Sequence, residues 1–151
     1  MKITLAAIAP RRGRSKTETT DRLIGDYIER ATRYVPCDSD LFDSETAFLD
    51  WLDRQTGRTS AYAILLDSLG QQFTSGEFAT HLGRLRDEGV QRLVLAIGPA
   101  DGWSPPARQR ANLLLSLGRM TLPHQLARLV LAEQVYRALT ILAGHPYHSG
   151  H

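Results

Sequence analysis

Two continuous apolar runs constrain the fold of this chain most strongly. Residues 61–66 read AYAILL and residues 93–97 read LVLAI, and neither run contains a charged side chain. Strands buried on both faces have this composition, because helices cover both faces of a parallel sheet. Segments with helical spacing of apolar residues lie between these runs and the other candidate strands. The sequence therefore predicts an α/β fold with a mostly parallel sheet and helices on both faces.

The remaining elements follow from the same patterns and from the turn residues. We expect strands at residues 2–9, 61–66, 93–97 and 112–117, and an edge strand at 35–42, where Pro36 breaks the alternation. We expect helices at 20–34, 44–55, 74–88 and 125–143, and a short helix that begins at Ser104 and Pro105. Because 151 residues are typical of one domain, we expect a single domain over residues 1–151.

Composition gives no sign of a membrane protein or of a disulfide framework. The longest apolar stretch is interrupted by Gly118, Pro123, His124 and Arg128, so it is too short to span a bilayer. The first apolar run precedes the positive charges, which is the reverse of a secretory signal. We therefore expect a cytoplasmic location and no membrane partner. The single cysteine, Cys37, cannot form an internal disulfide, and we expect it to be structural.

A basic run near the start of the chain is the main candidate for contact with nucleic acid. It consists of Arg11, Arg12, Arg14 and Lys16. The net charge of +2 is too small to identify a nucleic-acid-binding protein. The run could contact RNA phosphates, or it could be a solvated loop whose charges support solubility.

The last predicted helix, at 125–143, is apolar on two sides. Leu131, Val135 and Leu139 fall on one arc, whereas Leu126 and Val130 fall on another among polar residues. A sheet covers one side only, so we infer that a second copy of the chain covers the other. The alternative is that loops of the same chain cover it.

The ends of the predicted strands are the candidate ligand site, because ligands of open α/β sheets bind there. Leu66, the loop from Gly98 to Gly102 and the segment 117–124 all follow such strands. The three spaced glycines of a dinucleotide site and the Gly-Lys-Ser/Thr phosphate loop are absent, so NAD and ATP are disfavoured. Backbone groups and small apolar side chains suit adenine and a thioether better.

The histidine-rich tail is the second candidate for chemistry. His145 and His148 flank Pro146 and Tyr147, and this spacing raises the question of a metal. No Cys, Asp or Glu neighbours them, so we expect no metal, although a metal-binding protein that uses the terminal histidines is an alternative. Tyr147 with the histidines could orient a planar substrate and move a proton near neutral pH.

Four ordered motifs resemble a known family. They are IGPADG at 97–102, LSLGRMTLPH at 115–124, LAEQVYRA at 131–138 and HPYH at 145–148. Together they resemble the bacterial ribosomal RNA large subunit methyltransferase H family, which belongs to the SPOUT methyltransferases. The resemblance implies a C-terminal trefoil knot, S-adenosyl-L-methionine as methyl donor and a homodimer with the cofactor site at its interface. It further implies methylation of N3 of a pseudouridine in 23S rRNA on the ribosome.

The resemblance also implies roles for individual residues. Tyr147 and His148 would lie near the target base. His148 is the first candidate to accept the N3 proton, with Tyr147 as an orienting group, and a water or substrate-assisted route is the alternative. Arg11, Arg12, Arg14 and Lys16 could hold rRNA phosphates. The cofactor would contact Leu66, Gly98, Pro99, Gly102, Leu117, Gly118, Arg119, Met120, Thr121 and Leu122.

Two residues depart from the family pattern. Pro99 stands where the family usually has a second glycine, and proline has no N–H to offer a ligand. Ser149 follows HPYH where the family usually has a basic residue. These departures leave an alternative function open, namely an RNA- or ribosome-binding protein of the same fold with weakened or lost methyl transfer.

Overall fold

Five parallel strands form one sheet in the computed structural model, which describes residues 1–10, 18–54 and 59–149. The strand order is β2-β1-β4-β3-β5, and every recorded pairing between neighbours is parallel. The strands are β1 (Lys2–Ile8), β2 (Cys37–Phe42), β3 (Tyr62–Gln72), β4 (Arg92–Ile97) and β5 (Leu113–Ser116). The helices are α1 (Glu18–Ala31), α2 (Glu45–Asp53), α3 (Ser75–Asp87), α4 (Pro105–Arg110) and α5 (His124–Leu142). Among these residues no helix is both long and apolar enough to cross a membrane.

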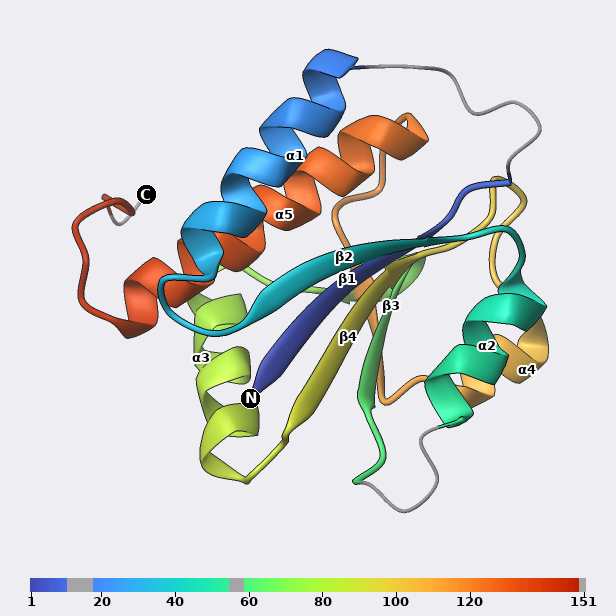
Figure 1. Cartoon of the computed structure of the whole chain (residues 1–151), viewed down its shortest axis with the longest axis horizontal. Coiled ribbons are helices and arrows are strands. Elements are labelled where there is room, and N and C mark those ends of the chain that lie inside the picture. Colours follow the sequence, from blue (N-terminus) through green and yellow to red (C-terminus); the bar gives the residue numbers. More distant parts are fainter. Residues whose placement is uncertain (11–17, 55–58, 150–151) are drawn as a thin grey trace.

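Helices cover both faces of the sheet, as Figure 1 shows. Side chains of β1 alternate between the two faces, so Ile3 and Leu5 join one buried cluster whereas Ala6 and Ile8 join the other. The first cluster packs against α1, α3 and α5, and the second packs against α2 and α4. The two-sided burial of β4, from Leu93 to Ile97, explains its wholly apolar sequence. The predicted α/β architecture is therefore confirmed.

Side-chain caps set the starts of three helices. Thr74 and Glu77 form a capping box before α3, and these hydrogen bonds to Thr74 lower the pKa of Glu77. Ser44 accepts the N–H of Ala47 at the start of α2, and Ser104 accepts the N–H of Ala107 at the start of α4. Glu45 of α2 accepts both the N–H and the hydroxyl of Ser104, which joins the two helices on one face.

Helix α5 lies against the sheet between α1 and α3 (Figure 1). Tyr136 of α5 packs against Tyr27 and Tyr34, with ring centroids 6.0 and 6.4 Å apart. Helix α1 and the segment that follows it thus cover the side of α5 that carries Tyr136. Leu126 nevertheless stays 43% exposed near the start of the helix. This exposed part is what a second copy would have to cover.

Strand β3 is longer than its apolar run predicts. We expected it to end at Leu66, but after an interruption it pairs with β5 again, where Gln71 and Gln72 lie opposite Leu115 and Ser116. The polar residues of this extension ended the apolar pattern, so the sequence did not reveal it. Gly70 permits the close approach of the strands, since a Cβ there would lie 2.5 Å from the backbone of Leu114. The trefoil knot stays a prediction.

Candidate active site

A pocket of about 430 Å³ lies at the carboxyl ends of β4 and β5, beside the middle of β3, where its first apolar part ends at Leu66. Loops after the last two strands form its walls, which is the usual ligand position in an open α/β sheet. Among the predicted cofactor residues, those that line it are Leu66, Gly98, Pro99, Gly102, Leu117, Gly118, Met120, Thr121 and Leu122. Segments distant in sequence therefore meet at one cavity.

Trp103 fixes the loop that follows β4. Its indole is 6% exposed and Nε1 donates a hydrogen bond to the carbonyl oxygen of Leu66 at 3.0 Å. Gly98 permits this packing, because a Cβ there would lie 2.7 Å from the indole ring. Between them the chain turns back, with the N–H of Gly102 donating to the carbonyl oxygen of Pro99 at 2.9 Å. Gly102 has φ +89°, a conformation that suits glycine.

An ion pair that the sequence did not indicate lies in the same pocket. The Asp67 carboxylate is 5% exposed and lies 3.0 Å from Arg108, whose side chain is 41% exposed. Its other oxygen accepts the N–H of Leu69 at 2.9 Å. The position of Asp67 directly after the apolar run 61–66 was a usable signal, but nothing in the sequence joined it to Arg108. The pair places the Arg108 guanidinium, held by Asp67, at the wall of a pocket of mixed polar and apolar lining.

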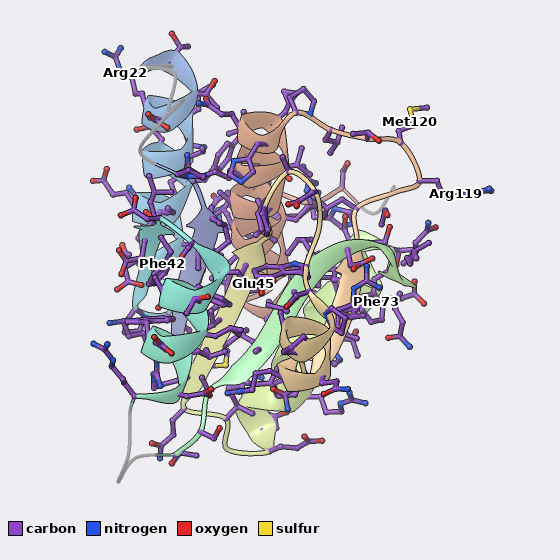
Figure 2. The ribbon with its side chains drawn as sticks, turned by 90° about the vertical axis from the view of Figure 1, so that its right-hand side faces the viewer. Arg22, Phe42, Glu45, Phe73, Arg119 and Met120 are labelled. Atoms are coloured by element: carbon purple, nitrogen blue, oxygen red, sulfur yellow. The ribbon has the colours of Figure 1, made fainter. Side chains whose placement is uncertain are left out.

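The loop after β5 is held by Ser116 at its base. The Ser116 hydroxyl donates to the carbonyl oxygen of Gly118 at 3.0 Å and accepts its N–H at 3.1 Å. Figure 2 shows Arg119 and Met120 projecting away from the body of the molecule. Met120 still borders the pocket and is 85% exposed, whereas Arg119 does not line it. Arg119 is thus the one predicted cofactor residue that the structure leaves outside the cavity.

His124 begins α5 next to this loop. Burial is the main cause that lowers the pKa of His124, and the positive charge of Arg128 lowers it further. Hydrogen bonds with the backbone of Ile8 and Gly98 raise this pKa by a smaller amount. Its Nε2 is buried without a hydrogen-bond partner among the residues that the structure describes. These surroundings favour a neutral imidazole at the carboxyl ends of β1 and β4.

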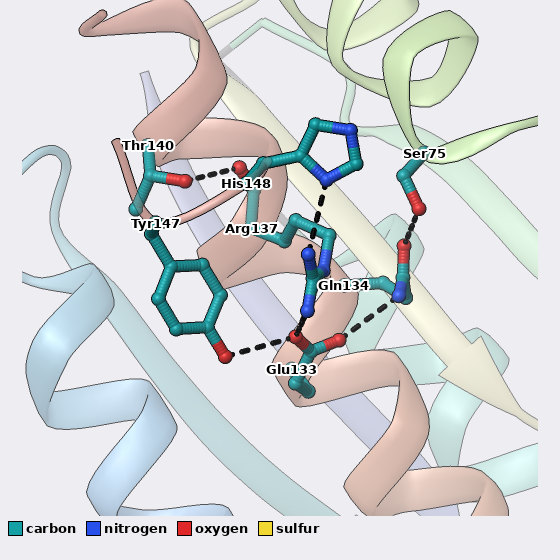
Figure 3. Close-up of polar contacts among 7 residues, drawn as sticks. All are labelled: Ser75, Glu133, Gln134, Arg137, Thr140, Tyr147 and His148. Carbon is teal, nitrogen blue, oxygen red and sulfur yellow. Dashed lines mark hydrogen bonds and ion pairs between the residues drawn. The ribbon is translucent and has the colours of Figure 1, made fainter. Parts of the chain in front are cut away.

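The predicted catalytic residues, Tyr147 and His148, lie in the tail that follows α5 and contact side chains of that helix (Figure 3). The Tyr147 hydroxyl donates to Glu133 Oε1 at 3.1 Å, and the Tyr147 ring packs on Tyr136 with centroids 4.8 Å apart. Arg137 lies 2.6 Å from the same carboxylate, and its Nη1 lies 3.0 Å from His148 Nδ1. Burial raises the pKa of Tyr147 to about 12, with the hydrogen bonds to Tyr27 and Glu133 adding to it. Its hydroxyl therefore stays protonated at neutral pH.

The tail and the pocket are separate within one chain. Neither Tyr147 nor His148 lines the pocket, which borders the start of α5, whereas the tail follows the end of that helix (Figure 1). The structure thus brings the cofactor residues together and the tail residues together, but not the two groups.

The remaining candidates from the sequence are Cys37, a metal site and the basic run near the start of the chain. Cys37 is buried, and burial raises the pKa of its thiol to about 12. No group of three metal-ligating side chains occurs within the described ranges, and His145 Nδ1 accepts the N–H of Tyr147 at 3.2 Å. The basic residues Arg11, Arg12, Arg14 and Lys16 lie outside the described residues.

Comparison with known proteins decides the family. The family model described as "Predicted SPOUT methyltransferase" matches residues 1–148. This chain belongs to that family. The predicted enzyme class, a methyltransferase, is thereby confirmed.

Similar curated proteins carry the name that the motifs indicated. The chain is 49% identical over 139 residues to "Ribosomal RNA large subunit methyltransferase H" of Koribacter versatilis, covering 92% of this chain and 94% of that protein. It is 56% identical over 88 residues to the protein of that name in Brucella anthropi, covering 58% of this chain and 55% of that protein. The match to the Brucella protein thus spans about half of its length.

A solved structure supports the fold. The SpoU methyltransferase AviRb from Streptomyces viridochromogenes, determined in complex with the cofactor AdoMet, is similar with a TM-score of 0.51 at 13% identity. The similarity covers 96% of this chain and 59% of that one. At this identity the likeness concerns the fold, and it agrees with the α/β architecture described above.

Proposed function

We propose that this chain transfers a methyl group from S-adenosyl-L-methionine to N3 of a pseudouridine in 23S rRNA, on the ribosome. The observation that carries the proposal is that one pocket is lined by all of the predicted cofactor residues except Arg119. Membership of the SPOUT methyltransferases and 49% identity to a protein named as an rRNA large subunit methyltransferase support it. We further propose that residues 1–151 act as one domain in the cytoplasm.

The pocket fits the cofactor chemically. Leu66, Ile97 and Leu117 supply apolar walls for adenine and the methionine chain, and glycine loops allow backbone groups to approach closely. Arg108, held by Asp67, offers a cation to a carboxylate. When bound, S-adenosyl-L-methionine supplies an electrophilic methyl group on a sulfonium sulfur. Pro99 offers no N–H, but its carbonyl oxygen holds the turn at Gly102, so the residue has a structural task in the loop.

Alignment accounts for most of the catalysis that such a transfer needs. Trp103 and Ser116 hold the two loops, which keeps the pocket in one shape. Tyr147 and His148 lie apart from the pocket in one chain, so we propose that the active unit is a homodimer in which a second copy completes the site. The exposed Met120, Leu122 and Leu126 around the pocket and the start of α5 supply an apolar surface for that contact.

Labelled methyl transfer to ribosomes that lack the modification tests the proposal, followed by mapping of the modified base. We expect one labelled pseudouridine in 23S rRNA, and label at another base or in protein would contradict the assigned substrate. Calorimetric titration with S-adenosyl-L-methionine separates the alternative function. A chain that binds rRNA but shows no cofactor binding at high micromolar concentration would be a binding protein of this fold without efficient transfer.

A further inference from the structure

One carboxylate organises the tail that carries Tyr147 and His148. Glu133 Oε1 lies 2.9 Å from Nε and 2.6 Å from Nη2 of Arg137, and it accepts the Tyr147 hydroxyl at 3.1 Å. The guanidinium also lies under the Tyr147 ring, 4.9 Å from its centroid. Glu133 and the Tyr147 ring therefore both hold Arg137 in place. The remaining guanidinium nitrogen, Nη1, lies 3.0 Å from His148 Nδ1 (Figure 3).

The chemistry of the two side chains fixes which one donates in the contact between Arg137 Nη1 and His148 Nδ1. A guanidinium carries five N–H donors, has no acceptor and stays protonated at every pH that a protein tolerates. Arg137 must therefore donate, and His148 Nδ1 must accept. A neutral imidazole that accepts at Nδ1 carries its proton on Nε2. An imidazole protonated at Nδ1 would instead turn an N–H toward a cation and leave Arg137 Nη1 without this acceptor.

We infer that Arg137 is a positioning residue that fixes the tautomer of His148, so that His148 serves the reaction as an Nε2–H hydrogen-bond donor. This inference rests on the proposed methyl transfer and changes the role of one residue in it, because a nitrogen that already carries the proton cannot accept another. His148 then contacts the target base through a carbonyl oxygen next to N3.

The chemistry of the target base suits a donor at this position. Pseudouridine N3 lies between two carbonyl groups, so the negative charge left after loss of its proton spreads onto their oxygens. The proton passes to water, the N3 electron pair forms the bond to the methyl carbon, and the pair of the broken carbon–sulfur bond stays on sulfur. A fixed N–H directed at one carbonyl oxygen stabilises the charge that develops in this step.

Tyr147 does not accept the N3 proton either. Its hydroxyl donates to Glu133, and burial raises its pKa to about 12. A phenol that stays protonated orients its neighbours by packing and hydrogen bonding. The described tail thus presents donors, and solvent takes the proton.

Two-bond ¹H–¹⁵N NMR of the ¹⁵N-histidine-labelled full chain, at about pH 8 where an ordinary histidine is neutral, tests the tautomer directly. His148→Gln identifies the His148 signal by removing it. We expect Nδ1 to be unprotonated and Nε2 to be protonated in the wild type, and we expect Arg137→Met to show averaged shifts of two tautomers. A proton on Nδ1 in the wild type, or unchanged shifts in Arg137→Met, overturns the inference.

Methyl transfer to unmodified ribosomes tests the donor role. A glutamine amide can place an N–H near the position of Nε2 but cannot accept a proton, so His148→Gln should stay within about tenfold of wild-type kcat, whereas His148→Ala should lose about a hundredfold. Equal loss in both variants overturns the donor role and restores His148 as the base.

His81 supplies a matched control. Arg84 Nη2 lies 3.0 Å from its Nδ1 in the same way, but both residues belong to α3 and no hydrogen bond or ion pair of the described residues joins them to Tyr147 or His148, so His81→Gln should transfer at the wild-type rate. Failure of the wild type to transfer any methyl group contradicts the proposed function, and the NMR spectrum still decides the tautomer in that case.

Discussion

The indole Nε1 of Trp103 lies 3.0 Å from the carbonyl oxygen of Leu66 and donates a hydrogen bond to it. This contact joins the loop after β4 to the first apolar part of β3, and both residues line the pocket. The Leu66 carbonyl oxygen thus accepts a hydrogen bond from a side chain. The same indole belongs to the buried cluster that includes Ala107 of α4. The shape of the pocket therefore depends on one buried indole.

Replacing Trp103 by Phe tests this dependence. The phenyl ring keeps much of the apolar packing but leaves the Leu66 carbonyl oxygen without its donor. We expect the free energy of unfolding to fall by about 1–3 kcal/mol and affinity for S-adenosyl-L-methionine to fall as the loop loosens. Urea unfolding and calorimetry measure the two effects, and unchanged values for both would show that the hydrogen bond has no role in the pocket.

Gly98→Ala should disturb the same loop from the other side. The added Cβ would lie 2.7 Å from Trp103 Cε2, so the indole or the loop must move. We expect a lower melting temperature and weaker cofactor binding. Gly25→Ala is the control, because a Cβ there meets nothing within 4 Å in α1 and should stabilise the helix by about 0.5–1 kcal/mol. Equal effects of the two substitutions would contradict the role of the Trp103 contact.

Local patterns predicted the elements well because local chemistry sets them. The Thr74 and Ser104 caps, and the apolar run that ends at Ile97, are readable in sequence and recur in the structure. The extension of β3 was missed because its pairing depends on the close approach at Gly70, a contact with a distant strand.

The same distinction holds for the site. Gly98 and Gly102 stood out as a ligand loop, whereas the pair of Asp67 and Arg108 joins residues whose neighbourhood only the fold creates. The motif HPYH indicated a reactive tail, but nothing in its spacing showed that Glu133 organises it. Arg119 was assigned to the pocket from its place in a motif, and its side chain instead points away from it (Figure 2).

His124 predicts a pH dependence of stability. Burial lowers its pKa below the ordinary value of 6.5, so the unfolded chain binds a proton at a higher pH than the folded chain does. Its contribution is therefore complete above about pH 6.5 and is lost as pH falls through the lower folded pKa. His81 shifts in the same direction, again mainly through burial. Both groups favour a folded state that is less stable in mild acid.

Thermal unfolding between about pH 5 and pH 8 measures this dependence. We expect the wild type to lose stability below about pH 6.5, and His124→Gln to lose less over the same range. His81→Gln reports the share of the second histidine. A slope for His124→Gln that equals the wild-type slope would contradict a neutral His124 in the folded protein.

The proposed homodimer predicts a difference between two similarly exposed leucines. Leu126, 43% exposed, begins the uncovered side of α5 beside the exposed loop residues Met120 and Leu122, whereas Leu23, 41% exposed, lies on α1. Leu126 lies in the first turn of α5, where a negative charge is favourable, whereas Leu23 lies further inside α1. Leu23→Asp therefore costs the helix at least as much as Leu126→Asp, so a dimer lost in Leu126→Asp alone reports the surface. We expect light scattering to give a dimer mass for the wild type and Leu23→Asp, and a monomer mass for Leu126→Asp.

The rate of methyl transfer should fall in the variant that loses the dimer, because the tail and the pocket are apart in one chain. A monomer mass for the wild type at micromolar concentration would overturn the shared site, and a dimer mass for Leu126→Asp would place the interface elsewhere on the molecule.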